Sequence, residues 1–269
     1  MRALSILSLA VVAAGCSSDA WGAPAAWKRV VLVELFTSQG CSSCPPADAF
    51  VRELPHLGLG RDRVVPLTFH VDYWDRLGWT DPFASPAFTD RQEWYARSNK
   101  LRSPDGAAGL DGLYTPQMIV DGAVQFSGQR RETAAHEMAR AAERPPAVDL
   151  AVRAAVRGPT VDLAVEVSGP GREQRDRDWR LVAALVAREA RTPVHRGENA
   201  GEVLDEAAVV RSLSARIPLP PSGSPARIQL SKPADLAWSA VDVVVFVQSE
   251  VTREIGVVRA IDAQDLRGR

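Results

Sequence analysis

Residues 36–48, FTSQGCSSCPPAD, decide how the first half of the chain folds, because two cysteines, Cys41 and Cys44, stand two residues apart between a strand signal and a helix signal. The valine-rich run at 28–36, KRVVLVELF, predicts a buried strand. The two prolines after Cys44 favour the first turn of a helix, where a missing N–H costs nothing. A second apolar run, RVVPLTFHV at 63–71, predicts a strand parallel to the first.

The next segment continues this pattern of alternating helices and strands. An aromatic stretch at 72–88 precedes an expected helix from about Thr89 to Leu101. QMIV and AVQF predict two strands joined by a tight turn at Asp121–Gly122. A helix over 130–144 follows and ends at Pro145–Pro146.

Beyond these prolines the composition changes to short, alternating apolar and polar runs with turn signals between them. Seven such runs predict an antiparallel β-sandwich; they begin with AVDLAVRAAV and end with IGVVRAI. We therefore expect an N-terminal α/β domain over 27–145 and an all-β sandwich domain over 146–269. RGENAG, at 196–201, predicts a loop to which the sequence assigns no mechanism.

The first 26 residues resemble an export signal rather than part of a domain. A charged start is followed by an apolar run that is shorter than the ~20 residues of a membrane span. The letters AAGC resemble a bacterial lipobox, in which Cys16 would be lipidated, and Ser17 after it favours the outer membrane. Ordinary cleavage near Ala23 is the alternative. Both predict a periplasmic or secreted protein.

Composition narrows the classes of function. The chain has 269 residues, a formal net charge of −1, 46% hydrophobic and 24% charged residues, as expected of a globular protein. Near-neutral charge gives no reason to expect a nucleic-acid partner. If Cys16 carries lipid or leaves with the signal, Cys41 and Cys44 are the remaining thiols, in a compartment where a disulfide persists. As a structural crosslink, a disulfide closing so short a loop would stabilise little.

The position of the pair at a helix N-terminus suits thiol chemistry. Backbone N–H groups and the helix dipole stabilise a thiolate there, so Cys41 is the expected nucleophile. Cys44, one turn into the helix, would resolve the mixed disulfide. No cofactor is required, and the expected partners are protein thiols or disulfides and an unknown redox partner.

The order strand, CxxC loop, helix, parallel strand, hairpin and helix resembles the thioredoxin superfamily. Thioredoxin-like proteins carry a cis-proline before the third core strand, and YTPQMIVDG has Pro116 in that place. The resemblance implies that the backbone of Thr115 pairs with a substrate strand while Pro116 packs on the disulfide. Alternatively, Pro116 merely starts a strand.

A second resemblance covers most of the chain after the signal. VELFTSQGCSSCPPAD, FHVDYWDRLGWTDPF, RQEWYA, YTPQMIVDG, VHRGENAGEVL and VVRSL resemble an uncharacterised bacterial family of exported thioredoxin-like proteins. That family is a domain of unknown function, so the resemblance implies a fold and a redox-active pair and no substrate.

Glu34 has two interpretations. Thioredoxin keeps a buried acid in the matching strand that relays protons to the resolving cysteine, and the resemblance offers Glu34 for that role. Alternatively, Glu34 pairs with an arginine at the end of the sheet.

The main rival function is metal binding. His70 and Asp72 share one face of the second strand. With Cys41 and Cys44 they would form a zinc or copper site in an exported metal-binding or delivery protein. The aromatics Trp74, Trp79, Phe83 and Phe88 line a groove beside the cysteines or, as we favour, form core. We thus expect a thiol–disulfide oxidoreductase, with a metal protein and an inert pair in a binding protein as alternatives.

Overall fold

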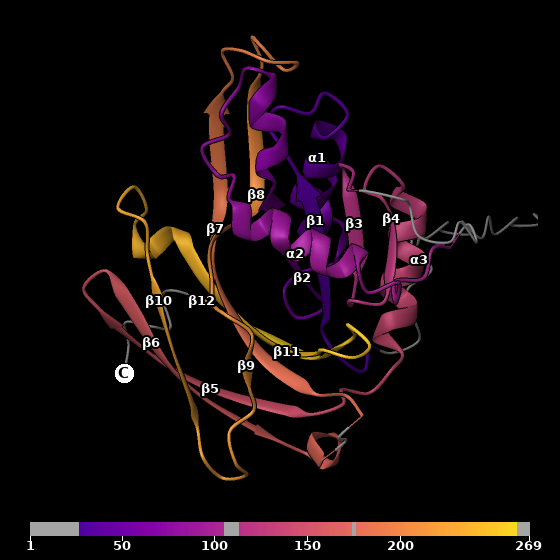
Figure 1. The fold of residues 1–269 in the computed structure, drawn as a ribbon, viewed down its shortest axis with the longest axis vertical. Coiled ribbons are helices and arrows are strands. Elements are labelled where there is room, and N and C mark those ends of the chain that lie inside the picture. Colours follow the sequence, from indigo (N-terminus) through magenta and orange to yellow (C-terminus); the bar gives the residue numbers. More distant parts are fainter. Residues whose placement is uncertain (1–26, 105–112, 174–175, 263–269) are drawn as a thin grey trace, which may run out of the picture.

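The computed structural model describes residues 27–104, 113–173 and 176–262 (Figure 1). The export signal expected over 1–26, with Cys16, lies outside these residues. The elements of the first half are β1 (Val31–Thr37), α1 (Pro45–Glu53), the 3-10 turn η1 (Leu54–Leu57), β2 (Val64–His70), η2 (Asp72–Leu77), α2 (Pro86–Ala96), β3 (Gln117–Val120), β4 (Val124–Ser127) and α3 (Arg131–Ala142).

The second half is built almost entirely of strands. Its elements are β5 (Asp149–Arg157), β6 (Thr160–Ser168), η3 (Pro170–Glu173), β7 (Trp179–Pro193), β8 (Val203–Leu213), β9 (Ile217–Pro218), β10 (Ala226–Ser231), η4 (Trp238–Ala240), β11 (Val241–Ser249) and β12 (Ile255–Asp262). The fold is therefore mixed α/β and mostly strands.

One large mixed sheet joins the two halves of the chain. Its strand order is β12-β11-β7-β8-β2-β1-β3-β4, with β9 paired to β7. β1 and β2 are parallel, whereas β3 and β4 are antiparallel to their neighbours. β8 joins β2 through one parallel pair, Thr68 with Val209. The sheet thus crosses the boundary expected near residue 145, and the division into two domains stays a prediction.

Helices cover both faces of the first-half strands. Alternate residues of β1 point to opposite faces: Val33 packs with α1 and α3, while Phe36 packs with α2. α1 begins with two prolines, as predicted, and buries Phe50 and Val51 against the sheet. The β1–α1–β2 unit therefore fixes the end of β1, where the cysteine loop begins.

A second, three-stranded antiparallel sheet, β10-β6-β5, packs on the larger one. Figure 1 shows these strands lying across β7 and β11. On β11, Val243 and Val245 face the small sheet, whereas Val244 and Phe246 face the core under α2. β7 and β11 are therefore buried on both faces, which explains their nearly continuous apolar sequences.

Two predicted details have clear outcomes. The hairpin between β3 and β4 is confirmed, with Asp121 and Gly122 both at positive φ, as its tight turn requires. The helix expected from Thr89 to Leu101 instead runs from Pro86 to Ala96. The prediction was wrong at its start because Ser85 caps the helix and Pro86 occupies its first turn, a signal already present in the sequence.

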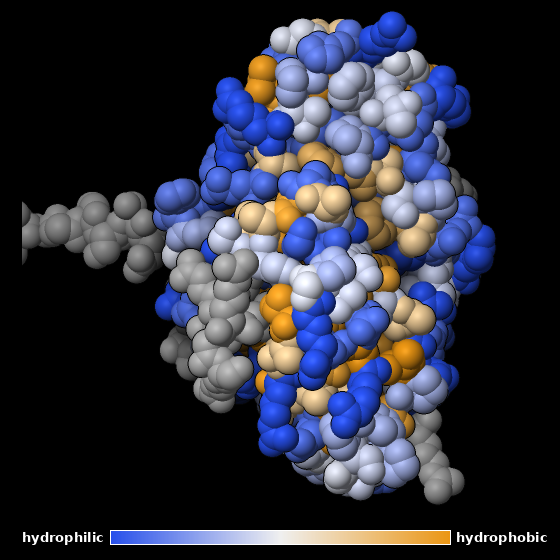
Figure 2. All heavy atoms as spheres, turned by 90° about the vertical axis from the view of Figure 1, so that its left-hand side faces the viewer, coloured by the Kyte–Doolittle hydropathy of each residue, from blue (hydrophilic) through white to orange (hydrophobic). Residues whose placement is uncertain are grey.

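From the side, the surface is largely hydrophilic, with hydrophobic side chains showing in its middle and lower parts (Figure 2). Among the described residues, the exposed large hydrophobic side chains are those of Leu77, Val203 and Val251. Within the described ranges no helix is both long and apolar enough to cross a membrane.

Candidate functional site

Cys41 and Cys44 form a disulfide at the N-terminus of α1, with their Cα atoms 5.5 Å apart. The Cys44 N–H donates to the Cys41 carbonyl at 3.2 Å, so the loop closes as a turn of helix. Both cysteines are fully buried, whereas Ser42 and Ser43 between them are exposed. The Cys41 Sγ lies 3.3 Å from the Ser43 hydroxyl, directly beneath that exposed pair.

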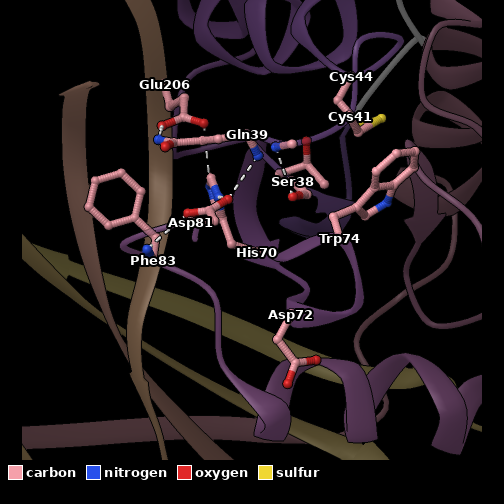
Figure 3. Close-up of polar contacts among 12 residues, drawn as sticks. Ser38, Gln39, Cys41, Cys44, His70, Asp72, Trp74, Asp81, Phe83 and Glu206 are labelled. Atoms are coloured by element: carbon pink, nitrogen blue, oxygen red, sulfur yellow. Dashed lines mark hydrogen bonds and ion pairs between the residues drawn. A yellow bond between two sulfur atoms is a disulfide. The ribbon is translucent and has the colours of Figure 1, made fainter. Parts of the chain in front are cut away.

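The segment before β3 lies against the cysteine loop. The Thr115–Pro116 peptide bond is cis, as the sequence predicted. Trp74 joins the two segments: its indole N–H donates to the Thr115 hydroxyl at 2.9 Å. On its other side, a Cβ added to Gly40 would approach the Trp74 Cβ to 3.2 Å. Figure 3 shows the Trp74 side chain beside the disulfide.

Pro116 also lies close to the start of α1. A Cβ on Gly128 would meet both Pro116, at 3.3 Å, and Ala47, at 3.0 Å. From the next residue, the Gln129 side-chain amide donates to the Ser43 carbonyl at 2.6 Å. Trp74 and the Gly128–Gln129 turn thus connect the Thr115–Pro116 segment to the cysteine loop and to the start of α1.

The loop between β7 and β8 reaches back to the cysteines. The Asn199 side-chain amide donates to the carbonyls of Gln39 and Cys41, at 2.8 and 3.0 Å. The Glu198 carboxylate accepts from the Ser42 N–H at 3.0 Å and from its hydroxyl at 2.8 Å. These residues belong to RGENAG, for which the sequence indicated no role. Contacts across more than 150 positions leave no local signal.

A buried polar cluster lies behind the cysteine loop (Figure 3). The His70 Nδ1 is 2.7 Å from the Asp81 carboxylate, and its Nε2 is 3.6 Å from the Glu206 carboxylate. Gln39 connects the cluster to the loop: its N–H donates to Asp81 and its side-chain amide donates to Glu206, both at 2.8 Å.

Burial and neighbouring charges shift the pKa values of His70, Asp81 and Glu206 in different directions. Burial opposes a charge on His70, but the carboxylates of Asp81 and Glu206 outweigh burial and raise the pKa of His70 to about 9. The same attraction outweighs burial at Asp81 and lowers the pKa of that carboxyl, whereas burial dominates at Glu206 and raises its pKa. At neutral pH the cluster therefore contains an imidazolium bonded to Asp81.

Asp48, on α1, is a site residue that the sequence analysis missed. It is nine-tenths or more buried, and its Oδ2 accepts from the Thr37 hydroxyl at 3.1 Å. Burial, reinforced by the nearby Glu206 carboxylate, raises the pKa of Asp48 to about 7. Asp48 stands four residues after Cys44, so the two side chains share one face of the helix. That spacing was a usable signal.

Three atoms of this region lack hydrogen-bond partners among the described residues. They are Asp48 Oδ1, His70 Nε2 and Glu206 Oε1. A buried polar atom without a partner is costly, and a catalytic role is one explanation of such an atom. The cluster therefore places buried carboxyl groups, two of them with an oxygen that accepts no hydrogen bond from the described residues, on the side of α1 that carries Cys44.

Glu34 does not belong to the cluster behind the cysteine loop but to a separate buried group under α2. Its carboxylate accepts from the Arg91 guanidinium at 2.5 Å and from the Tyr95 hydroxyl, and Gln248 completes this buried group. Arg91 and Tyr95 belong to α2, on the face of the sheet opposite α1. Of the two interpretations of Glu34, pairing with an arginine is the one that the contacts support.

The four residues of the metal hypothesis are not brought together. Asp72 accepts from the Thr89 hydroxyl at 2.5 Å, and Figure 3 shows it pointing away from the disulfide. His70 points to the acidic cluster instead. Across the described ranges, no three His, Cys, Asp or Glu side chains are arranged to hold a metal ion.

The aromatic residues divide between the site and the core. Phe88 is buried and packs edge-on against Phe69. Trp74 and Trp79 are half-buried beside the cysteine loop, and the Trp79 indole donates to the Gln39 side chain at 3.2 Å. Phe83 packs edge-on against His70. Core packing therefore holds for Phe88, whereas three of the four residues border the site.

A disulfide at a helix N-terminus, bordered by a cis-proline segment and an acidic cluster, defines a candidate thiol site. The model of the family described as "Protein of unknown function (DUF1223)" matches residues 32–248, so the chain belongs to that family. A search of curated proteins finds no significant match.

Two solved structures are similar. A protein from Agrobacterium tumefaciens, with an X-ray crystal structure, is 26% identical over 88% of this chain and 96% of its own, with a TM-score of 0.62. HBP35 of Porphyromonas gingivalis is 12% identical over 88% of this chain and 76% of its own, with a TM-score of 0.60. The second likeness concerns the fold alone.

Proposed function

We propose that this protein is an exported thiol–disulfide oxidoreductase whose first half is a thioredoxin-like domain. The observation that carries the proposal is the Cys41–Cys44 disulfide at the N-terminus of α1, where Cys44 is the N-cap, next to Trp74, which bonds the cis Thr115–Pro116 segment. The parallel pair β1 and β2 flanking α1, and the antiparallel β3–β4 hairpin before α3, support the assignment of the domain.

The chemistry assigns a role to each cysteine. The thiolate of Cys41 attacks one sulfur of a protein disulfide, forming a mixed disulfide and releasing the other sulfur as a thiolate. Cys44 then loses its proton and attacks the Cys41 sulfur. The substrate leaves as a dithiol and the Cys41–Cys44 disulfide forms, so two electrons pass to the substrate. The same steps in reverse oxidise a dithiol.

Asp48 is the group that we assign to the Cys44 proton, in place of Glu34. Glu34 is committed to Arg91 and Tyr95 on the other face of the sheet. Asp48 follows Cys44 by one helical turn, has an unpartnered oxygen, and has a pKa raised by burial to about 7. A carboxyl group with that pKa accepts and returns a proton near neutral pH.

Substrate strands would contact the Thr115–Pro116 segment, as in thioredoxin-like proteins. Because both cysteines are buried, the substrate reaches the Cys41 sulfur only when the covering groups shift. The exposed Ser42 and Ser43 mark the side from which it would approach. The export signal predicted from the sequence supports an oxidising compartment, and no observation favours the metal-delivery alternative.

Reduction of a protein disulfide such as insulin, with dithiothreitol as electron donor, tests the proposal. We expect the wild-type chain to accelerate the reaction. Cys41→Ala should abolish the acceleration, and Cys44→Ala should accumulate a mixed disulfide on Cys41. Ser224→Ala, at an exposed position in the second half of the chain, is the control and should retain activity. Full acceleration by Cys41→Ala would refute the proposal.

A further inference from the structure

Carboxylates bind the backbone on both sides of Cys41. Asp81 accepts the Gln39 N–H at 2.8 Å, two residues before the cysteine. Glu198 accepts the N–H of Ser42, the next residue, at 3.0 Å. Two loop amides that could stabilise an anion are therefore already bonded to anions.

The groups behind the loop add acidic side chains. Asp48 and Glu206 lie buried there, and His70, the cationic member of the cluster, is bonded to Asp81. Arg130 is adjacent to Gln129, which bonds the Ser43 carbonyl, and Arg196 lies two residues before Glu198; both arginines are exposed, so solvent and salt screen their charge. Three buried carboxyl groups thus face one imidazole on this side of the loop.

This arrangement works against a thiolate on Cys41. Free amides, cations and a helix N-terminus lower a thiol pKa and stabilise the reduced pair, which makes a pair a strong oxidant. Here the helix N-terminus favours the thiolate, while the bonded carboxylates oppose it. The disulfide is therefore more stable relative to the dithiol than it would be without these carboxylates. A pair whose disulfide is the more stable form acts as a reductant.

We propose that the Cys41–Cys44 pair works in the reducing direction, and that Glu198 of the β7–β8 loop is a positioning residue that sets this bias through Ser42. This inference rests on the proposed function. Each cycle oxidises the two thiols to a disulfide and reduces one substrate disulfide to two thiols, transferring two electrons and two protons. A dithiol donor must then reduce the Cys41–Cys44 disulfide again.

The loop offers a matched pair of variants. Glu198→Gln removes the charge but keeps an oxygen that can accept the Ser42 N–H. Glu202→Gln removes the same charge from an exposed position on the same loop. A difference between the two variants therefore reports the charge at Ser42 rather than net charge or loop structure.

The experiment equilibrates the full chain with buffers of reduced and oxidised glutathione and traps free thiols. With reduced glutathione in excess, we expect the wild-type disulfide to predominate. Glu198→Gln should raise the equilibrium constant for dithiol formation about threefold at low salt, the size of an exposed charge interaction, and the difference should fade at high salt. Glu202→Gln should match the wild type.

Two results would overturn the inference while leaving the proposed function intact: a wild-type pair that is mainly dithiol in that buffer, or equal shifts from both variants. A wild-type disulfide that exchanges with neither glutathione nor excess dithiothreitol, while the protein stays folded, would overturn the proposed function as well. The two failures are thus distinguishable in one set of samples.

Discussion

The side-chain amide of Asn199 donates a 3.0 Å hydrogen bond to the carbonyl oxygen of Cys41, across 158 positions of the chain. The same amide donates to Gln39 at 2.8 Å, and Asn199 is buried. The second half of the protein therefore holds the cysteine loop directly.

Removing this contact should loosen the loop. Asn199→Ala leaves two carbonyl oxygens without their donors, and we expect the free energy of unfolding to fall by about 2 kcal/mol. Urea unfolding with the disulfide intact measures the change. Glu202→Ala, an exposed position on the same loop, should change it by less than about 0.5 kcal/mol. Equal losses in the two variants would show that the bonds to the loop are not the cause.

Asp48 should make stability depend on pH. Its pKa in the folded chain is about 7, against an ordinary value of 3.8. From pH 4 upward the unfolded chain loses this proton while the folded chain keeps it, so the free energy of unfolding falls until about pH 7. Asp48→Asn, which stays neutral, should gain on the order of 4 kcal/mol over the wild type at pH 8 and less than about 1 kcal/mol at pH 4.

Urea unfolding at the two pH values measures this difference. The exposed Asp90→Asn is the control and should follow the wild type at both. His70 has a pKa of about 9, above its ordinary 6.5, and contributes a further loss of stability as pH rises from 6.5 to 9. That loss occurs in the wild type and in Asp48→Asn alike, so it cancels in the difference between them. If Asp48→Asn raised the free energy of unfolding equally at pH 4 and pH 8, the raised pKa of Asp48 would be contradicted.

Glu34 should be structural. Glu34→Gln leaves the Arg91 charge buried without its counter-ion, which costs about 3 kcal/mol. Thermal or urea unfolding measures this loss. Below the unfolding transition, the pH dependence of disulfide exchange should match that of the wild type. Glu93→Gln breaks an exposed pair with Arg97 and should cost less than about 0.5 kcal/mol. An altered pH profile in Glu34→Gln would restore its role as proton acceptor.

Trp74 and Thr115 should be energetically coupled. Trp74→Phe removes the indole donor, and Thr115→Val removes the acceptor with little change in shape. A double-mutant cycle on the free energy of unfolding should give a coupling of about 1 kcal/mol, the net value of a neutral hydrogen bond. Strictly additive effects would mean that this hydrogen bond contributes nothing to holding the two segments together.

Much of the local structure followed from the sequence, because the signals were local. The two prolines after Cys44 marked the start of α1, and Asp121–Gly122 marked the β3–β4 turn. Missing Ser85 as a cap shifted the expected start of α2 by three residues. Propensities and turn chemistry act over a few residues, so they can be read from one chain.

The contacts that complete the site could not be predicted in this way. The hydrogen bond from Asn199 to Cys41 and the pairing of β8 with β2 join distant segments, and only the folded chain brings them together. Glu34 had two reasonable partners in the sequence, and its choice depended on where α2 packs. Asp48 is a different case. Its four-residue spacing from Cys44 could be read from the sequence, whereas its burial could not.

Trapping of the mixed disulfide is the most direct test of the role of Cys41. The folded Cys44→Ala chain is mixed with a disulfide substrate, quenched in acid and mapped by mass spectrometry. We expect a substrate bound to Cys41, and in the wild-type chain a Cys41–Cys44 disulfide that a dithiol reduces reversibly without unfolding. A disulfide that resists reduction until the protein unfolds, with no adduct on Cys41, would contradict that role.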